Sequence, residues 1–110
     1  MKTQIPGIII SVTAAADLTA RRFVGLDGNV CGAGAKALGV CDVDTASGNQ
    51  GPVVLNGVIL IEAGAAVTAG SQVESDANSR AIPLNTGASN GYALDSASAA
   101  GELIRIVRGI

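Results

Sequence analysis

The stretch at residues 32–37, Gly-Ala-Gly-Ala-Lys-Ala, has the residue types of a nucleotide-binding loop. A P-loop cradles phosphate on backbone amides and needs a serine or threonine after its lysine to hold magnesium, but Ala37 follows Lys36. The dinucleotide pattern G-x-G-x-x-A is also present in this stretch. That fingerprint must open a helix, whereas Gly39 and a β-rich run follow at once. We therefore expect a flexible loop here and no nucleotide cofactor.

Two pairs of aspartates have a setting that could support acid chemistry or metal binding. Asp42 and Asp44 resemble the start of a calcium loop, but positions 46, 47 and 53 hold alanine, serine and valine instead of an oxygen ligand, a glycine and a glutamate. Asp27 and Asp76 would form a glycosidase pair only if they faced a common cleft. Each precedes an asparagine by two residues, a context typical of turn capping. We expect turns at all four positions and no bound metal.

The remaining reactive side chains lack the neighbours that catalysis needs. The chain has no histidine and no Ser-x-x-Lys arrangement, so no base is available to activate a serine. Cys31 and Cys41 are the only cysteines, and a zinc site needs four ligands. We expect them to be buried free thiols, with a disulfide bridge as the alternative. The sequence predicts no enzyme, no catalytic residue and no cofactor.

The charge balance limits the partners that the chain can bind. Seven basic and nine acidic residues give a net charge of -2, and there is one tyrosine, one phenylalanine and no tryptophan. Nucleic-acid binding requires a concentrated basic surface and usually stacking aromatics, so we expect no nucleic-acid partner. The basic clusters are Arg21-Arg22 and Arg105 with Arg108. They are either solvated or pair with acidic groups of a protein partner.

The N-terminal residues are apolar and have an extended character. Residues 1–10 include Ile5, Pro6, Ile8 and Ile10, with a hinge at Pro6-Gly7. The apolar run is shorter than the roughly 7–15 residues of a signal sequence, and no run approaches the ~20 residues that span a bilayer. We expect an arm and first strand over 1–10, a single β domain over 11–110, and no membrane partner. Our hypothesis is that the arm adds to the sheet edge of a neighbouring protein through these four residues.

Short β-rich runs separated by turn residues recur along the chain. They cover residues 8–13, 23–26, 30–31, 38–43, 52–55, 58–62, 72–75, 80–84, 91–94 and 102–107. Asn56-Gly57 lies between two of these runs and is the strongest hairpin signal. In the last run Ile104 and Ile106 share one face, which we expect to point inward. The alanine-rich segments 14–20 and 93–100 have room for single helical turns only. About nine short strands predict an all-β, single-domain barrel or sandwich.

Two segments of the chain resemble each other. Residues 18–29 align with residues 67–78 at a constant offset of 49, since Thr19 matches Thr68 (68 minus 19). Threonine, alanine, valine, aspartate and asparagine coincide in the alignment. An internal pseudo-repeat would divide the domain into halves of about 14–58 and 63–110. The alternative is chance similarity, because the chain is crowded with alanine and glycine.

Several segments resemble, in order and spacing, the small head-decoration or capsid cement proteins of tailed bacteriophages. They are Pro6-Gly7-Ile8, the Ala-x-x-Leu-Thr-Ala-x-x-Phe-Val approach at 15–24 with Leu26-Asp27-Gly28, and the segments 37–40, 57–64, 68–70 and 99–104. The resemblance covers nearly all of the chain. Members of this family sometimes carry a recombinase-like label, which the absence of a P-loop contradicts here.

The resemblance implies a β-rich protein bound in many copies to the outside of an HK97-type capsid, where it bridges neighbouring capsomers. The implied partners are the major capsid protein and further copies of the chain, as a homodimer or homotrimer at two-fold or three-fold lattice positions. The implied location is the outer capsid surface of the virion, after synthesis in the host cytoplasm. The competing function is a small β-barrel module that binds a ligand or a carbohydrate.

Overall fold

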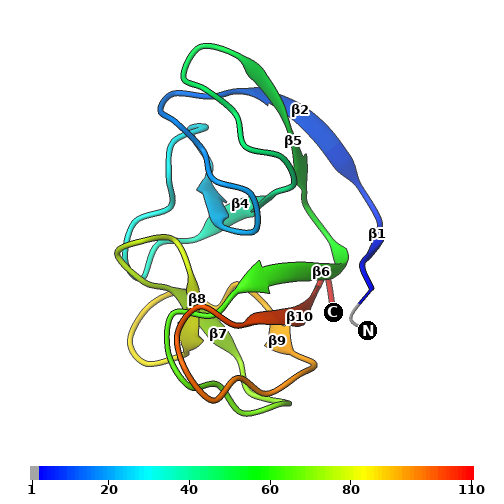
Figure 1. The fold of residues 1–110 in the computed structure, drawn as a ribbon, viewed down its shortest axis with the longest axis vertical. Helices are drawn as coiled ribbons and strands as arrows, with labels where there is room; N and C mark the ends of the chain where they lie inside the picture. The colour runs from blue at the N-terminus through cyan, green and yellow to red at the C-terminus, as the bar shows by residue number, and fades with distance from the viewer. Residues whose placement is uncertain (1–2) are drawn as a thin grey trace.

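The computed structural model describes residues 3–110 as ten β-strands in three antiparallel sheets, with no helix among those residues (Figure 1). The strands are β1 (Ile5–Pro6), β2 (Ile9–Thr13), β3 (Phe23–Gly25), β4 (Ala37–Cys41), β5 (Gln50–Val54), β6 (Gly57–Glu62), β7 (Val73–Ser75), β8 (Ala81–Pro83), β9 (Tyr92–Ala93) and β10 (Leu103–Arg108). Two four-stranded sheets form a sandwich-like domain, and β7 pairs with β8 in a smaller sheet. The all-β prediction is confirmed, in its sandwich form and not as a closed barrel.

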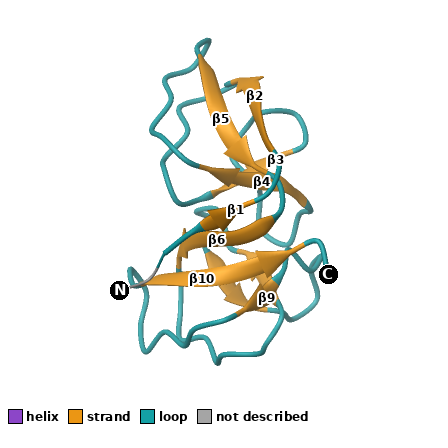
Figure 2. Ribbon diagram, turned by 90° about the vertical axis from the view of Figure 1, so that its right-hand side faces the viewer, coloured by secondary structure: helices purple, strands orange, loops and turns teal. Residues whose placement is uncertain are grey.

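The N-terminal strands form one edge of each large sheet. The strand orders are β2-β5-β4-β3 and β1-β6-β10-β9, so β2 lies beside β5 and β1 lies beside β6. Figure 2 looks onto the second sheet, in which β6 and β10 pair along their whole length. The chain from Ile5 to Thr13 therefore runs along the same side of both sheets, as the blue strands of Figure 1 show.

The hairpin predicted at Asn56-Gly57 is wrong, because β5 and β6 belong to different sheets. The dipeptide is the corner at which the chain passes from one sheet to the other. Gly57 has a φ of 98°, and a Cβ at this position would lie 2.6 Å from both the nitrogen of Gly7 and the carbonyl oxygen of Ile5. The carbonyl of Asn56 accepts the N–H of Gly7 at 3.0 Å. Residues that favour a tight turn in isolation serve here to hold the N-terminal segment against the corner.

The two halves of the chain share one strand order. The order β2-β5-β4-β3 of the first sheet corresponds to β6-β10-β9 of the second, followed by β7. An isolated bridge joins Gln72, the residue before β7, to Tyr92 of β9. A bridge between Leu18 and Thr45 in the first half corresponds to one between Val67 and Ala97 in the second. The corresponding strands span 9–54 and 57–108. The pseudo-repeat with halves of about 14–58 and 63–110 stays a prediction, which this strand order supports.

The two Asp-x-Asn turns are alike in their hydrogen bonding. Oδ1 of Asp27 accepts the N–H of Asn29 at 3.0 Å, and Oδ1 of Asp76 accepts the N–H of Asn78 at 2.8 Å. A side chain that accepts from the backbone two residues later makes an Asx turn. Turn capping, predicted for both aspartates, is confirmed.

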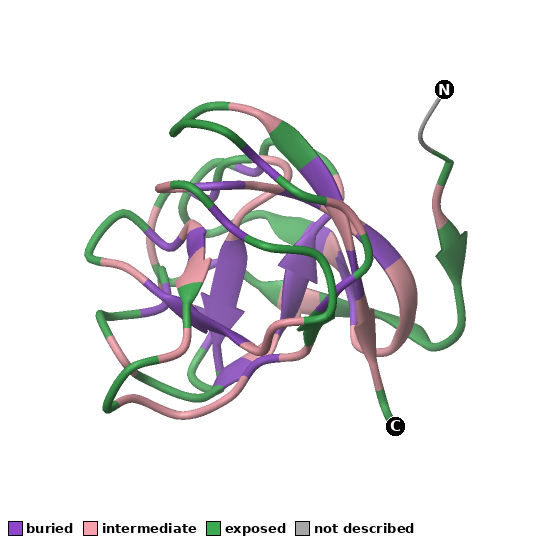
Figure 3. Cartoon of the chain, turned by 90° about the horizontal axis from the view of Figure 1, so that it is seen from below, coloured by how far each residue is buried: buried purple, intermediate pink, exposed green. Residues whose placement is uncertain are grey.

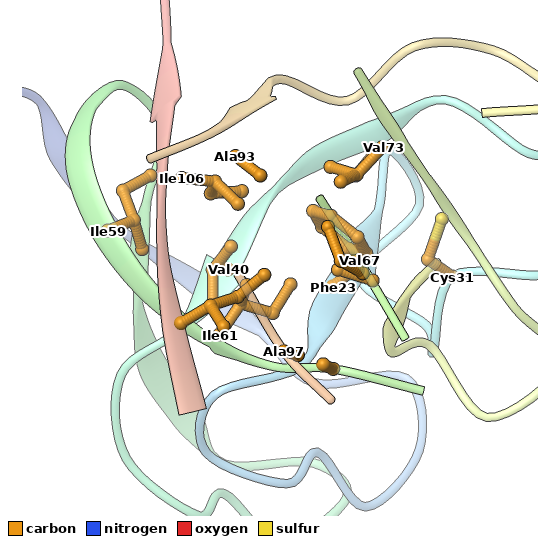
Figure 4. Packing of buried hydrophobic residues seen from close by; sticks show 14 of the residues in the cluster. Phe23, Cys31, Val40, Ile59, Ile61, Val67, Val73, Ala93, Ala97 and Ile106 are labelled. Carbon is orange, nitrogen blue, oxygen red and sulfur yellow. The ribbon is translucent and has the colours of Figure 1, made fainter. Parts of the chain in front are cut away.

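The core lies between the sheets and is built from small and β-branched side chains (Figure 4). Ile59 and Ile61 of β6 pair with Ile106 and Ile104 of β10, and all four are fully buried. Burial of each contributes about 1.5–3 kcal/mol. The inward orientation predicted for Ile104 and Ile106 is therefore confirmed. Phe23 is the largest buried side chain of the same cluster.

The alanine-rich segments do not form the helical turns for which they have room. Ala93 ends β9, and residues 14–20 and 94–100 lie in bends, turns and irregular chain, each segment with one isolated bridge to a distant segment. Ala14 and Ala97 are buried beneath these turns. Small side chains at these positions let the connecting segments lie directly on the sheets, which costs less side-chain entropy than burying longer residues.

Candidate protein-interaction surface

Exposed isoleucines concentrate on the N-terminal edge. Their side chains range from 39% exposed at Ile10 to 68% exposed at Ile5, with Ile8 and Ile9 between these values. Figure 3 places this segment at the periphery of the molecule, coloured as exposed. Within residues 3–110, β1 pairs only with β6 and β2 only with β5. The edge thus presents unpaired backbone groups flanked by apolar side chains, a combination that favours pairing with another strand.

An apolar row crosses the outer face of the second sheet from this edge. Ile5 lies opposite Val58, Val58 opposite Val107, and Val107 opposite Tyr92. Residues directly opposite one another in antiparallel strands project to the same face. Ile104 and Ile106, which alternate with Val107 along β10, are fully buried, so the row lies on the opposite, solvent-facing side of the strand. We call these four residues the outer row.

Arg21, one of the predicted contact residues, supports the N-terminal segment. Its Nη1 lies 2.7 Å from Oδ1 of Asp42 and donates to Oε1 of Gln4 at 3.2 Å. The same Gln4 oxygen accepts the N–H of Leu60 in β6 at 3.1 Å. Arg21 has a φ of 65°, a strained value for a residue with a side chain. The guanidinium therefore helps to fix the residue that precedes β1.

Arg22 belongs to a compact ion-pair network. Its Nη2 lies 3.5 Å from Oε1 of Glu62, whose Oε2 lies 3.3 Å from Nη1 of Arg80. Arg80 Nε also lies 3.5 Å from Oδ2 of Asp76. These pairs tie β6 to the loops that precede β3 and β8.

The two C-terminal arginines have different surroundings. Arg105 forms a two-pronged ion pair with Asp95, with Nε and Nη2 each 3.0 Å from a carboxylate oxygen, and this hydrogen bonding raises the pKa of Arg105. Arg108 instead donates from Nη1 to the carbonyl of Leu38 and from Nη2 to that of Ala37, both at 2.9 Å. Burial lowers the pKa of Arg108. The structure thus separates the four arginines among three regions of the surface.

The residues considered for chemistry have structural roles. Asp42 pairs with Arg21, and Oδ1 of Asp44 accepts the N–H of Ala20 at 2.7 Å. Cys31 and Cys41 are buried free thiols, as predicted, and burial raises the pKa of both. A thiol with a raised pKa is protonated at neutral pH and is a poor nucleophile. Residues 3–110 contain no cluster of metal-binding side chains and no helix able to cross a membrane.

Sequence reasoning missed most of the outer row. Val58, Val107 and Tyr92 come from three separate strands, and only the sheet register brings them beside Ile5. The alternation of Leu103, Arg105 and Val107 along the last strand was a visible signal of a second, solvent-facing side. Its neighbours could not be named without the strand order.

Comparisons with known proteins identify the family of the chain as a whole. No curated protein matches the chain. Among solved structures, the chain is similar to the N base of the head fiber gp8.5 of bacteriophage phi29, with a TM-score of 0.73, 19% sequence identity, and coverage of 91% of this chain and 92% of that chain. At this identity the likeness concerns the fold. The model of the phage cement protein family matches residues 3–108. Since this match covers nearly the whole chain, the protein belongs to the phage cement protein family.

Proposed function

We propose that the protein binds the outer surface of a phage head and bridges neighbouring major capsid proteins of the HK97-type fold, which stabilises the shell. The observation that carries this proposal is the family match over residues 3–108. A cement needs contact area and not reactive groups, and a stable contact buries about 800 Å² on each partner. Repetition over the lattice adds avidity, so that weak individual contacts suffice.

We assign the contact with the capsid to the N-terminal edge, with Ile5, Pro6, Ile8 and Ile10 as its apolar residues. The chain from Ile5 to Thr13 lies along its own sheets, and no strand of residues 3–110 pairs with its outer side, which could therefore accept a strand of the neighbour. Main-chain hydrogen bonds would provide affinity, and alternate isoleucines would provide specificity. Strand addition of this kind requires no rearrangement of the domain.

The arginines take part in the proposed interface in two ways. Arg21 and Arg22 act as supports, since one fixes Gln4 before β1 and the other is paired to Glu62 of β6. Arg105 lies on the same face of β10 as Val107 of the outer row, and Arg108 follows Val107 at the end of the strand. We propose that these two contact the partner directly.

The test is sedimentation of the purified protein with undecorated phage heads. We expect co-sedimentation that saturates at a stoichiometry related to the lattice, and the same heads should withstand a higher temperature when decorated. Light scattering of the free protein distinguishes a homodimer from a homotrimer. If the protein stays in the supernatant at every concentration, the cement proposal is wrong and the ligand-binding alternative takes its place.

Deletion of residues 1–7 tests the assignment of the edge. The shortened protein should keep its folded core, because Ile59, Ile61, Ile104 and Ile106 remain, and should lose binding to heads. Hydrogen exchange of the β6 and β10 amides checks that the core is intact. Unchanged binding by the folded, shortened protein would place the contact elsewhere.

A further inference from the structure

Two basic residues of the described chain differ from the others in having no carboxylate partner. Within residues 3–110, every arginine except Arg108 lies within 4.0 Å of a carboxylate oxygen. Arg108 and Lys36 donate to backbone carbonyls instead, and Nζ of Lys36 lies 2.7 Å from the carbonyl oxygen of Ser89. Carbonyl dipoles offset a positive charge only in part. The charges of these two cations are therefore only partly compensated within residues 3–110.

Both cations line the same groove. It has a volume of about 360 Å³ and lies where the Asn56 corner, β9 and the end of β10 meet. Polar side chains of Asn56, Gln72 and Tyr92 also line it. Its lining contains no aspartate or glutamate, and Ile110, the last residue of the sequence, lines it as well. A groove with two positive charges, further hydrogen-bond donors and no acidic side chain is suited to an anionic group.

Unused donors remain on both cations. A guanidinium carries five N–H donors and Arg108 uses one on each of two carbonyls, which leaves three (5 minus 2). An ammonium carries three donors, and Lys36 uses one on Ser89. Arg108 is partly removed from water, and its pKa is lowered for that reason. Its guanidinium keeps its charge, because arginine is not deprotonated in proteins.

The groove is continuous with the outer row. Val107 and Tyr92 belong to the row and also line the groove. Asn56 lines the groove and holds Gly7 and Ile8 of the N-terminal edge through its own oxygens. A protein that covered the row would therefore pass over the groove, whereas a small free anion would contact the groove alone.

We propose that this groove binds a carboxylate from an acidic side chain of the capsid partner, an inference that rests on the proposed function. The bound aspartate or glutamate compensates Lys36 and Arg108 while its own chain lies on the apolar row. Charged groups placed in this way fix the register of an interface and discriminate against partners that lack the matching charge. A protein carboxylate is favoured over a nucleic-acid phosphate because the groove joins an apolar surface and the chain carries a net charge of -2.

The first test compares two variants in binding to undecorated heads. Lys36→Glu reverses the charge at an exposed position, and Ser47→Glu adds a negative charge at an exposed turn between β4 and β5 that does not line the groove. We expect Lys36→Glu to lower the affinity for heads about tenfold or more and Ser47→Glu to bind as the native protein does. If the native protein binds heads and the two variants bind with equal affinity, the groove does not bind a capsid carboxylate, and the proposed cement function still stands.

The second test needs no heads. Tetraglutamate, inorganic phosphate and a short single-stranded oligonucleotide are titrated at matched ionic strength into isotope-labelled protein. Tetraglutamate should shift the amide signals of Tyr92 and Arg108, and Lys36→Glu should abolish those shifts. A response to phosphate or to the oligonucleotide without one to tetraglutamate would overturn the assignment to a carboxylate. If the native protein does not bind heads, the cement function is wrong. The response to tetraglutamate then decides by itself whether the groove binds a carboxylate.

Discussion

The side-chain oxygen of Asn56 accepts the backbone N–H of Ile8 at 2.8 Å, across 48 positions of the chain. The carbonyl of the same asparagine accepts the N–H of Gly7. One residue at the corner between the sheets therefore holds the point at which the N-terminal segment passes from β1 to β2. Asn56 therefore helps to position the N-terminal edge, together with the pairing of β1 with β6 and of β2 with β5.

Replacement of Asn56 by alanine should loosen β2 and leave the core in place. The lost hydrogen bond costs about 0.5–1.5 kcal/mol, and the amides of residues 9–13 should exchange with solvent faster than in the native protein. Asn49→Ala is the matched control, since the hydrogen bonds of Asn49 to Ala14 and Ala46 use its backbone. Equal exchange in both variants would show that the Asn56 side chain does not hold the edge.

The close approach of β4 and β5 predicts a large cost for one small substitution. A Cβ at Gly39 would overlap the carbonyl oxygen of Val54 and lie 2.8 Å from Cγ1 of Val53. We expect Gly39→Ala to lower the free energy of unfolding by about 1–3 kcal/mol, because neither neighbour can move without disturbing the sheet. The measurement is unfolding in urea.

Gly32 provides the control for this substitution. Its Cβ would meet no atom within 4 Å, and its φ lies outside the left-handed region. Gly32→Ala should be neutral or stabilise the fold by roughly 0.4–1 kcal/mol through the unfolded chain. A similar loss of stability in both variants would contradict the packing explanation.

The buried thiols predict a loss of stability at alkaline pH. Burial raises the pKa of Cys31 and Cys41 above the ordinary value of 9.0, so the folded state holds these protons more tightly than the unfolded chain does. The stability that the two protonated thiols contribute is fully present below pH 9.0, the ordinary thiol pKa. It is lost as the pH rises through the raised pKa of the folded state. The free energy of unfolding should therefore fall as the pH rises above about 9.

A double variant, Cys31→Ala with Cys41→Ala, isolates this effect. All other titratable residues are the same in both proteins, so only the thiol contribution differs. The variant should start from a lower stability at pH 7 and lose less of it as the pH rises. Parallel curves from pH 7 to pH 11 would mean that the thiols do not contribute.

The outer row predicts a binding defect without a folding defect. Ile5 is 68% exposed and Leu26 is 70% exposed, so serine at either position removes a similar apolar side chain from a similar environment. Ile5→Ser should weaken binding to heads roughly fivefold or more, whereas Leu26→Ser should not. Thermal unfolding of both variants checks that their stability is unchanged. Equal binding by the two variants would remove Ile5 from the contact.

The all-β fold was predictable because its signals are local. Alternation of Ile104 and Ile106 identified the buried face of the last strand, and Asp-x-Asn identified two turns. The corner at Asn56-Gly57 was not predictable, since the same dipeptide suits a hairpin and a crossing between sheets. What decides between them is the N-terminal segment, which comes from a distant part of the sequence.

The surface was less predictable than the fold. Exposed isoleucines near the N-terminus are visible in the sequence, but Tyr92 and Val58 join them only through the register of β1, β6, β10 and β9. Charge presented the same difficulty. Composition alone does not distinguish Arg105, which pairs with Asp95, from Arg108, which faces two carbonyls.

The two halves differ on the outer side of their first strands. In the second half β6 has β1 on its outer side, while in the first half the corresponding strand, β2, borders solvent on that side among the described residues. The two-residue strand β1 thus pairs with the first strand of one sheet, whereas no described strand pairs with the corresponding side of β2 in the other sheet. A segment of a neighbouring protein laid along β2 would complete the internal symmetry, with β1 as the template for its direction and spacing.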